Sequence, residues 1–264
     1  MKPATKNIVL GAGYVYFDEH AADGSLTGER YLAETPGFSL TVASESLEDY
    51  SSDGPIAEKH MDVAIRVTRD AALTLKDMST ENFAIFLIAQ AAILSTTAGA
   101  VEDTPINAGN GVQQGRWYQL GVNDDYPTGV RQITGLVVHD DAVTPNVFTL
   151  DDDYEVDLEL ARIYIVPGGG IANDTVLQGD FNRTVASWDQ VSSNDLGAKT
   201  GALRYVAHNT RGQNRDLYLP DVVMKPDGEF AFKSRDTVQQ MGFAVSVNTP
   251  GDGRSAVYLN GRPV

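Results

Sequence analysis

Alternation of apolar and polar residues, the pattern of half-buried strands, runs through most of the chain. Apolar residues occupy every second position in 38–42 and again in 61–75, where Arg69 is the one polar interruption. The second segment therefore predicts one long strand, or two strands with a break near Arg69. Serine, acidic residues and a Gly-Pro pair fill residues 43–60 between them, so this segment is predicted to form the tip of a long hairpin.

Strand-like segments recur in the second half of the chain, with turn signals rich in glycine between them. The expected segments are Leu136–Val138, Val147–Leu150, Tyr154–Val166, Val176–Asp180, Ala202–Ala207, Asp216–Leu219, Val222–Met224, Glu229–Lys233, Met241–Val247 and Ala256–Leu259. Within Tyr154–Val166 the apolar phase shifts by one residue, which predicts a β-bulge. About a dozen strands indicate a mainly all-β fold, a β-sandwich or barrel with loop extensions.

One helix is expected, with Ser79 as its N-cap and apolar residues at helical spacing from Phe83 to Leu94. Apolar residues also fill its other sides, so we expect it to be covered nearly all round. Residues 98–128 are rich in glycine, asparagine and glutamine and are predicted to form a polar loop or insertion.

No linker rich in proline and serine separates the two strand-rich halves, so we expect one elaborated domain over residues 1–264. In this organisation, 1–97 forms an N-terminal arm, the long hairpin and the helix. The loop 98–128 follows, and 129–264 forms the second strand-rich half and a C-terminal extension.

Acidic residues outnumber basic ones, 36 to 20, which gives a net charge of −16 and argues against a surface built to grip nucleic-acid phosphates. The excess lies in residues 1–200, with 12 basic and 30 acidic side chains, whereas 201–264 hold 8 and 6. The absence of cysteine excludes disulfides, thiolate nucleophiles and zinc fingers. No apolar stretch reaches the roughly 20 residues that span a bilayer, and no export signal is evident, so we expect a protein made in a cytoplasm, without a membrane partner.

Chemical motifs are weak. Gly11 and Gly13 lack the third glycine of a dinucleotide loop, and the four histidines (His20, His60, His139 and His208) show no ligand spacing. Six carboxylates fall between Asp151 and Glu159, but alternation favours a solvated acidic strand face over a calcium cage. We therefore expect neither an enzyme nor a cofactor nor a metal, with a hydrolase that uses this carboxylate group as the rival interpretation.

Three parts of the chain carry distinctive runs. They are Leu10–Asp18 with Thr27–Leu32, Glu34–Leu40 and Tyr50–Gly54; Asp153–Asp157 with Ala161–Ile171; and Leu219–Val222 with Pro226–Phe230 and Gln239–Phe243. Together these runs resemble the major tail tube proteins of long-tailed bacteriophages with flexible, non-contractile tails. The shared features are structural rather than catalytic and spread over the whole chain.

The resemblance implies a β-sandwich subunit that forms hexameric rings, which stack into the tail tube of a virion after assembly in the host cytoplasm. It implies a tape measure protein in the lumen, tail terminator and distal tail proteins at the ends, and double-stranded DNA that passes through without specific binding. An acidic lumen would repel the DNA phosphates.

On this interpretation, residues 44–59 are expected to form the loop that stacks one ring on the next and to become ordered mainly on assembly. The residues expected to carry it are Ser44, Glu45, Glu48, Asp49, Tyr50, Asp53, Glu58 and Lys59. In the weakly basic C-terminal segment, Arg211 and Arg215 are expected to meet an acidic surface of a neighbouring subunit. An ordinary surface hairpin is the alternative for 44–59.

A second class of function stays open: another virion β-sandwich protein, either a tail-assembly module or a carbohydrate-binding module. The binding module would use aromatic platforms such as Trp117-Tyr118 or Trp188. The low number of tryptophans weighs against carbohydrate binding.

Overall fold

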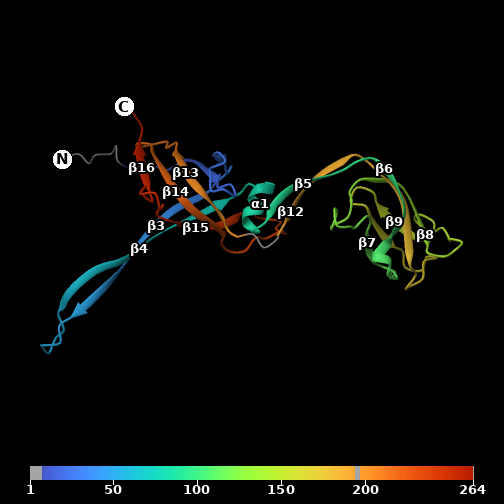
Figure 1. Ribbon diagram of the computed structural model, residues 1–264, viewed down its shortest axis with the longest axis horizontal. Helices are drawn as coiled ribbons and strands as arrows, with labels where there is room; N and C mark the ends of the chain where they lie inside the picture. The colour runs from blue at the N-terminus through green and yellow to red at the C-terminus, as the bar shows by residue number, and fades with distance from the viewer. Residues whose placement is uncertain (1–7, 194–196, 264) are drawn as a thin grey trace. The chain divides into compact units, whose positions relative to one another are not determined.

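A computed structural model describes residues 8–193 and 197–263, which form two compact units. Unit 1 comprises Met1–Ala92 and Val191–Val264, and unit 2 comprises Ile93–Gln190. Strands dominate both units, and the strands of the eight-stranded sheet and of both three-stranded sheets pair antiparallel, which confirms the all-β expectation. The described residues contain a single α-helix (Figure 1), which is too short to cross a membrane.

Unit 1 contains one eight-stranded sheet in the order β2-β1-β13-β14-β15-β4-β3, with β16 paired to β14. Its elements are β1 (Gly13–Glu19), β2 (Arg30–Tyr31), β3 (Gly37–Tyr50), β4 (Lys59–Leu75), α1 (Thr80–Phe86), β13 (Lys199–Ala207), β14 (Arg215–Pro226), β15 (Met241–Val247) and β16 (Tyr258–Gly261). The long strand β14 pairs with β16 through its first half and with β15 through its second half. This change of partner lets the sheet fold over itself.

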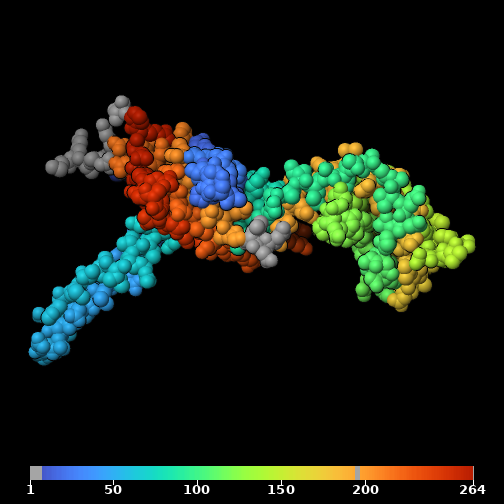
Figure 2. Space-filling model, viewed as in Figure 1, coloured from blue at the N-terminus to red at the C-terminus, as the bar shows by residue number. Residues whose placement is uncertain are grey.

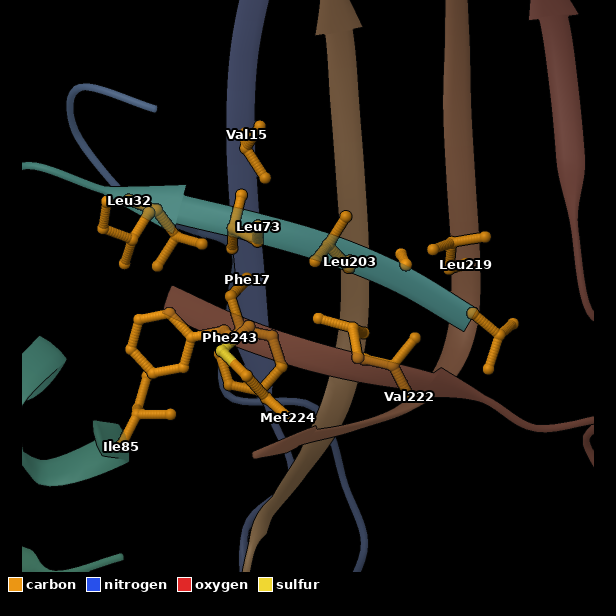
Figure 3. Packing of buried hydrophobic residues seen from close by; sticks show 14 of the residues in the cluster. Val15, Phe17, Leu32, Leu73, Ile85, Leu203, Leu219, Val222, Met224 and Phe243 are labelled. Carbon is orange, nitrogen blue, oxygen red and sulfur yellow. The ribbon is translucent and has the colours of Figure 1, made fainter. Parts of the chain in front are cut away.

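The two layers of that sheet enclose the core of unit 1. Figure 3 shows β4 and β15 crossing β1, β13 and β14, with apolar side chains filling the space between them. Phe17 and Leu203 come from one layer and Phe243 from the other, and each is at most 1% exposed. Burial of such a side chain contributes about 1.5–3 kcal/mol, so this interlayer packing holds the sandwich together.

The helix is shorter than the sequence predicts. It ends at Phe86, Ile88 takes a left-handed backbone (φ +49°), and a strand, β5 (Gln90–Thr96), begins two residues later. The predicted helical segment up to Leu94 is therefore wrong, because a short apolar run does not by itself distinguish helix from strand. Ser79 stands at the N-cap position, but its side chain makes no capping hydrogen bond.

Unit 2 contains two three-stranded sheets, β7-β10-β9 and β6-β11-β8, around a second core. Its elements are β6 (Gly99–Pro105), the 3-10 segment η2 (Ile106–Gly109), β7 (Trp117–Gln119), β8 (Ile133–Asp140), β9 (Tyr154–Asp157), β10 (Arg162–Ile165) and β11 (Leu177–Arg183). The predicted loop 98–128 is an integral part of this unit, since Ile106, Val112 and Leu120 are fully buried. The polar composition of 98–128 led to the loop prediction, because these three core residues are isolated among polar neighbours.

The expected single bulged strand Tyr154–Val166 is instead a hairpin. β9 and β10 pair antiparallel, and the chain reverses through 158–161, where Ala161 has φ +52°. Alternation is interrupted at the turn and then resumes, which mimics the sequence signature of a bulge.

Several other boundaries also differ from the expectation. β14 is one strand where two were expected, Glu229–Lys233 is not a strand, and β12 (Ala186–Ser192) was not predicted. β5 and β12 pair with each other and carry the chain from unit 1 into unit 2 and back. The division into two units differs from the single domain expected over 1–264, because paired strands rather than a Pro/Ser-rich linker make the connection.

Candidate interaction surface

The hairpin β3–β4 is the most exposed part of unit 1. Its strands pair from Gly37↔Thr74 out to Tyr50↔Lys59, much further than the sequence predicted. Every residue in 41–50 and in 59–68 is exposed, and Figure 2 shows this part of the hairpin standing clear of the body of unit 1. We call residues 41–68 the arm.

The predicted stacking loop 44–59 lies within the arm, but most of it is strand. Ser44, Glu45, Glu48, Asp49 and Tyr50 belong to β3, Lys59 opens β4, and Asp53 and Glu58 lie in the connecting turn. The turn is thus residues 51–58 rather than 43–60. Because this segment is rich in serine and acidic residues, and acidic residues are poor strand formers, the outer half of β3 was predicted as a loop.

A bulge divides the arm into two parts with different faces. The register shifts between Glu45↔Arg66 and Ser46↔Ala64, which leaves Ile65 as the extra residue on β4. Residues of β4 beyond the bulge therefore point to the face opposite that expected from unbroken alternation. In the outer arm, Leu47 and Val63 are directly paired on one face.

That outer face is uncovered and mainly apolar, with Asp49 as its one acidic residue, paired with Met61. Leu47 is 54% exposed, Val63 47% and Met61 41%, and Ile65 at the bulge is 58% exposed. A two-stranded ribbon is marginally stable in water without a partner for its apolar face. The outer arm therefore presents a surface suited to contact with another protein.

The opposite face of the outer arm is charged. The Lys59 ammonium lies 2.6 Å from carboxylate oxygens of both Glu48 and Asp62, and the Tyr50 hydroxyl donates to Glu48 at 2.6 Å. The hydrogen bonds from Lys59 and Tyr50 hold the pKa of Glu48 below its usual value. The network is exposed to solvent, so it contributes little to the stability of unit 1.

Both edges of the arm are free. β15 pairs only with Asp70–Leu75 of β4, and β3 is the last strand of the sheet. Among the described residues, no further strand therefore covers the edges of the arm. Long exposed strand edges offer rows of N–H and C=O groups to which another chain can pair.

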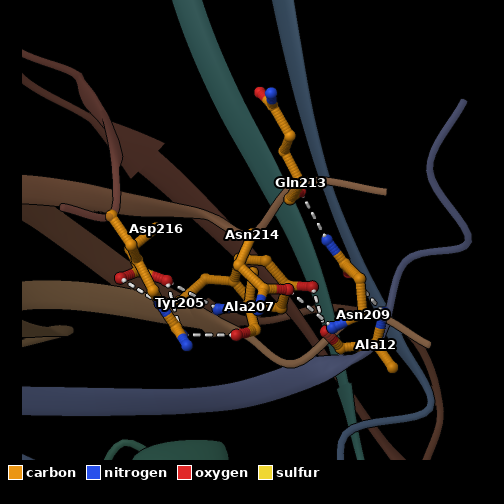
Figure 4. A network of polar contacts seen from close by, with 8 residues as sticks. Ala12, Tyr205, Ala207, Asn209, Gln213, Asn214 and Asp216 are labelled. Carbon is orange, nitrogen blue, oxygen red and sulfur yellow. Dashed lines mark hydrogen bonds and ion pairs between the residues drawn. The ribbon is translucent and has the colours of Figure 1, made fainter. Parts of the chain in front are cut away.

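Arg211 lies in the turn between β13 and β14, Arg215 is the first residue of β14, and both are exposed. Hydrogen bonds hold this turn (Figure 4): the Asn209 side chain accepts from the Ala12 amide at 3.0 Å and donates to the Gln213 carbonyl at 2.9 Å. Within residues 8–193 and 197–263 neither guanidinium forms an ion pair. Arg215 also lines an open groove of about 570 Å³.

The carboxylates of the acidic segment Asp151–Glu159 differ in their surroundings. The Asp153 carboxylate accepts from the backbone amides of Thr149 (2.8 Å) and Gly170 (2.5 Å), and these bonds lower its pKa. Glu155 and Glu159 are exposed. Asp153 therefore serves to close a turn in unit 2.

Both tryptophans lie in unit 2 and are partly covered by arginine. Trp117 is 44% exposed, with the Arg162 guanidinium 4.9 Å from its ring centroid, and Arg131 approaches Trp188 at 5.9 Å. Trp117 borders a groove of about 460 Å³. Arginine thus occupies positions over the indole rings that a sugar platform would need.

The spacing of the four histidines suggested that none of them has a metal-ligating neighbour, but His139 differs. His139 lies beside the carboxylates of Asp103 and Asp180, which come from two other strands. These residues are 36 and 41 positions away from His139 in the chain, so no local motif could reveal the group.

Residues 8–217 match the family described as "protein of unknown function UCP028589". The match covers more than half of the chain, so the protein belongs to this family. A comparison with curated proteins found no match.

Proposed function

We propose that this protein is the subunit of a phage tail tube, in which copies of the chain form rings that stack into a conduit for DNA. In this proposal the rings are hexameric and enclose a tape measure protein during assembly in the host cytoplasm. Tail terminator and distal tail proteins close the ends of the tube in the virion. The resemblance of the sequence runs supplies the identity of these partners.

The arm is the observation that carries the proposal. It combines an apolar face (Leu47, Met61 and Val63) with two free strand edges, and such a surface is costly to expose in a protein that acts alone. Contact with a second copy of the chain satisfies both features at once. Repetition of such a contact around and along an axis builds rings and tubes.

The charge of the chain fits a conduit. A net charge of −16 at pH 7 offers DNA repulsion instead of the lysine and arginine contacts that release counterions and hold nucleic acid. DNA then slides through the tube without binding to it. In this proposal, the exposed Arg211 and Arg215 contact acidic groups of a neighbouring subunit.

The test uses the purified full chain in negative-stain electron microscopy and sedimentation velocity. The wild type is expected to form rings or tubes with a bore wide enough for a duplex about 20 Å across. Val63→Glu places a charge on the apolar face and should abolish assembly. Ala64→Glu adds the same charge one residue away on the opposite face and should leave assembly intact.

Circular dichroism of both variants checks that each monomer is folded. A wild-type chain that stays monomeric at every concentration would overturn the proposal, and so would tubes formed equally well by Val63→Glu. The role of the arginines is tested separately by Arg211→Glu with Arg215→Glu. Normal assembly of that double variant at all salt concentrations would refute the proposed charge contact between subunits.

A further inference from the structure

Three side chains with metal-ligand chemistry converge on one sheet of unit 2. Asp103 comes from β6, Asp180 from the central strand β11 and His139 from β8. His139 Nε2 lies 3.4 Å from Asp180 Oδ1 and 3.6 Å from Asp103 Oδ1. One ligand atom from each residue lies within 4.8 Å of the other two.

The backbone is distorted where these residues meet. On β6, Glu102 and Asp103 together face Asp180, and Asp103 has a left-handed backbone with φ +50°. Its amide donates to Asp180 Oδ1 at 2.8 Å, which ties the bulge to the central strand. Bulges redirect side chains, and a left-handed non-glycine residue persists only when the surrounding structure fixes it. Here the distortion brings Asp103 to the histidine.

The second ring nitrogen of His139 fixes which atom faces the carboxylates. Nδ1 lies 3.0 Å from the Asp140 carbonyl oxygen, which can only accept, so Nδ1 carries the proton. In the neutral ring, Nε2 then directs a lone pair at two carboxylate oxygens, an arrangement that repels unless a cation lies between them or Nε2 takes up a proton and donates to Asp180. The side chain is only 7% exposed, so water screens this repulsion poorly.

We propose that Asp103, His139 and Asp180 form a binding site for a divalent transition metal of the zinc type. With metal–ligand distances of about 2.1 Å, neighbouring ligands of a tetrahedral ion lie about 3.4 Å apart. The two distances from Nε2 match this spacing. The carbonyl of Asp140 orients the imidazole, as an outer partner of a metal-bound histidine commonly does.

The ligand set also indicates which ions bind. A buried imidazole favours zinc and similar transition metals over calcium and magnesium, which prefer oxygen ligands alone. The Asp103 side chain is 75% exposed, so water has access to complete the coordination. The bound ion links all three strands of the sheet β6-β11-β8 and stabilises unit 2 by binding only its folded form. This inference does not depend on the tail tube proposal.

The test titrates Zn²⁺ into the full chain, previously treated with a chelator, by isothermal titration calorimetry. The wild type should bind one ion per chain, and Co²⁺ in its place should give the visible absorption of a low-symmetry site. Asp103→Asn and Asp180→Asn should each weaken binding at least about 10-fold. Glu102→Gln is the matched control, because it removes the same charge from the neighbouring exposed residue of β6 and should leave the affinity unchanged.

Asp103→Asn is the decisive variant, because the Asp103 side chain is exposed and can be replaced without disturbing the core. Replacement of the buried His139 could unfold unit 2. The absence of Zn²⁺ and Co²⁺ binding in the wild type would overturn the proposal and leave His139 as a partner in an ion pair alone. An equal loss of affinity in Glu102→Gln and Asp103→Asn would also overturn it, since only diffuse attraction to acidic residues would remain.

Discussion

The two units should unfold as separate transitions, because each has its own hydrophobic core. Phe243 lies at the centre of unit 1, is 1% exposed, and packs edge-on against Phe86 of α1 with ring centroids 5.8 Å apart. Phe243→Ala removes a buried ring and leaves a cavity, which costs about 3–5 kcal/mol. In a unit of this size 1 kcal/mol corresponds to about 2–4 °C, so the unit 1 midpoint should fall by about 10 °C.

The tryptophans make the assay selective, since Trp117 and Trp188 both lie in unit 2. Thermal unfolding followed by tryptophan fluorescence should be unchanged in Phe243→Ala, whereas circular dichroism should show an earlier transition. Ile163→Ala, in the core of unit 2, should produce the reverse result. A Phe243→Ala shift of the same size in both signals would refute the independence of the two cores.

Three further outcomes are expected. Asn82→Ala should destabilise unit 1 by about 1–3 kcal/mol in urea unfolding, because the fully buried amide accepts from Arg30 at 2.9 Å, and a change below 0.5 kcal/mol would contradict this role. Ala108→Gly should stabilise unit 2 by about 0.5–1 kcal/mol, since Ala108 is exposed with φ +52°, and a lower melting temperature would contradict that reasoning. The lowered pKa of Asp153 adds stability above the unfolded-state pKa near 3.9, and this contribution is lost as the pH falls through the folded-state pKa. Acid unfolding of Asp153→Asn should accordingly show a weaker pH dependence than the wild type.

Sequence patterns predicted the strands of unit 1 well where alternation was strong. Met241–Val247 matches β15 at both ends, and 61–75 falls within one long strand. The bulge at Ile65 was not predictable, because the apolar alternation continues through it and only pairing with β3 reveals the shift. Local pattern reports which residues alternate and not which partner they face.

The candidate surfaces show the same limit. The arm was foreseen as a hairpin from its polar tip, but its apolar outer face follows from the register and the bulge rather than from composition. The group of Asp103, His139 and Asp180 was missed entirely. It depends on three strands that are distant in sequence, and on a bulge that turns Asp103 toward the other two.

The pairing of β5 with β12 has a consequence for how the protein can change over generations. Unit 2 is a continuous segment whose two ends leave side by side, so its gain or loss alters neither the path nor the spacing of the flanking chain in unit 1. Such a segment behaves as a cassette that one recombination event can exchange. Relatives that lack it, or carry another fold in its place, should keep the sheet of unit 1 and its arm.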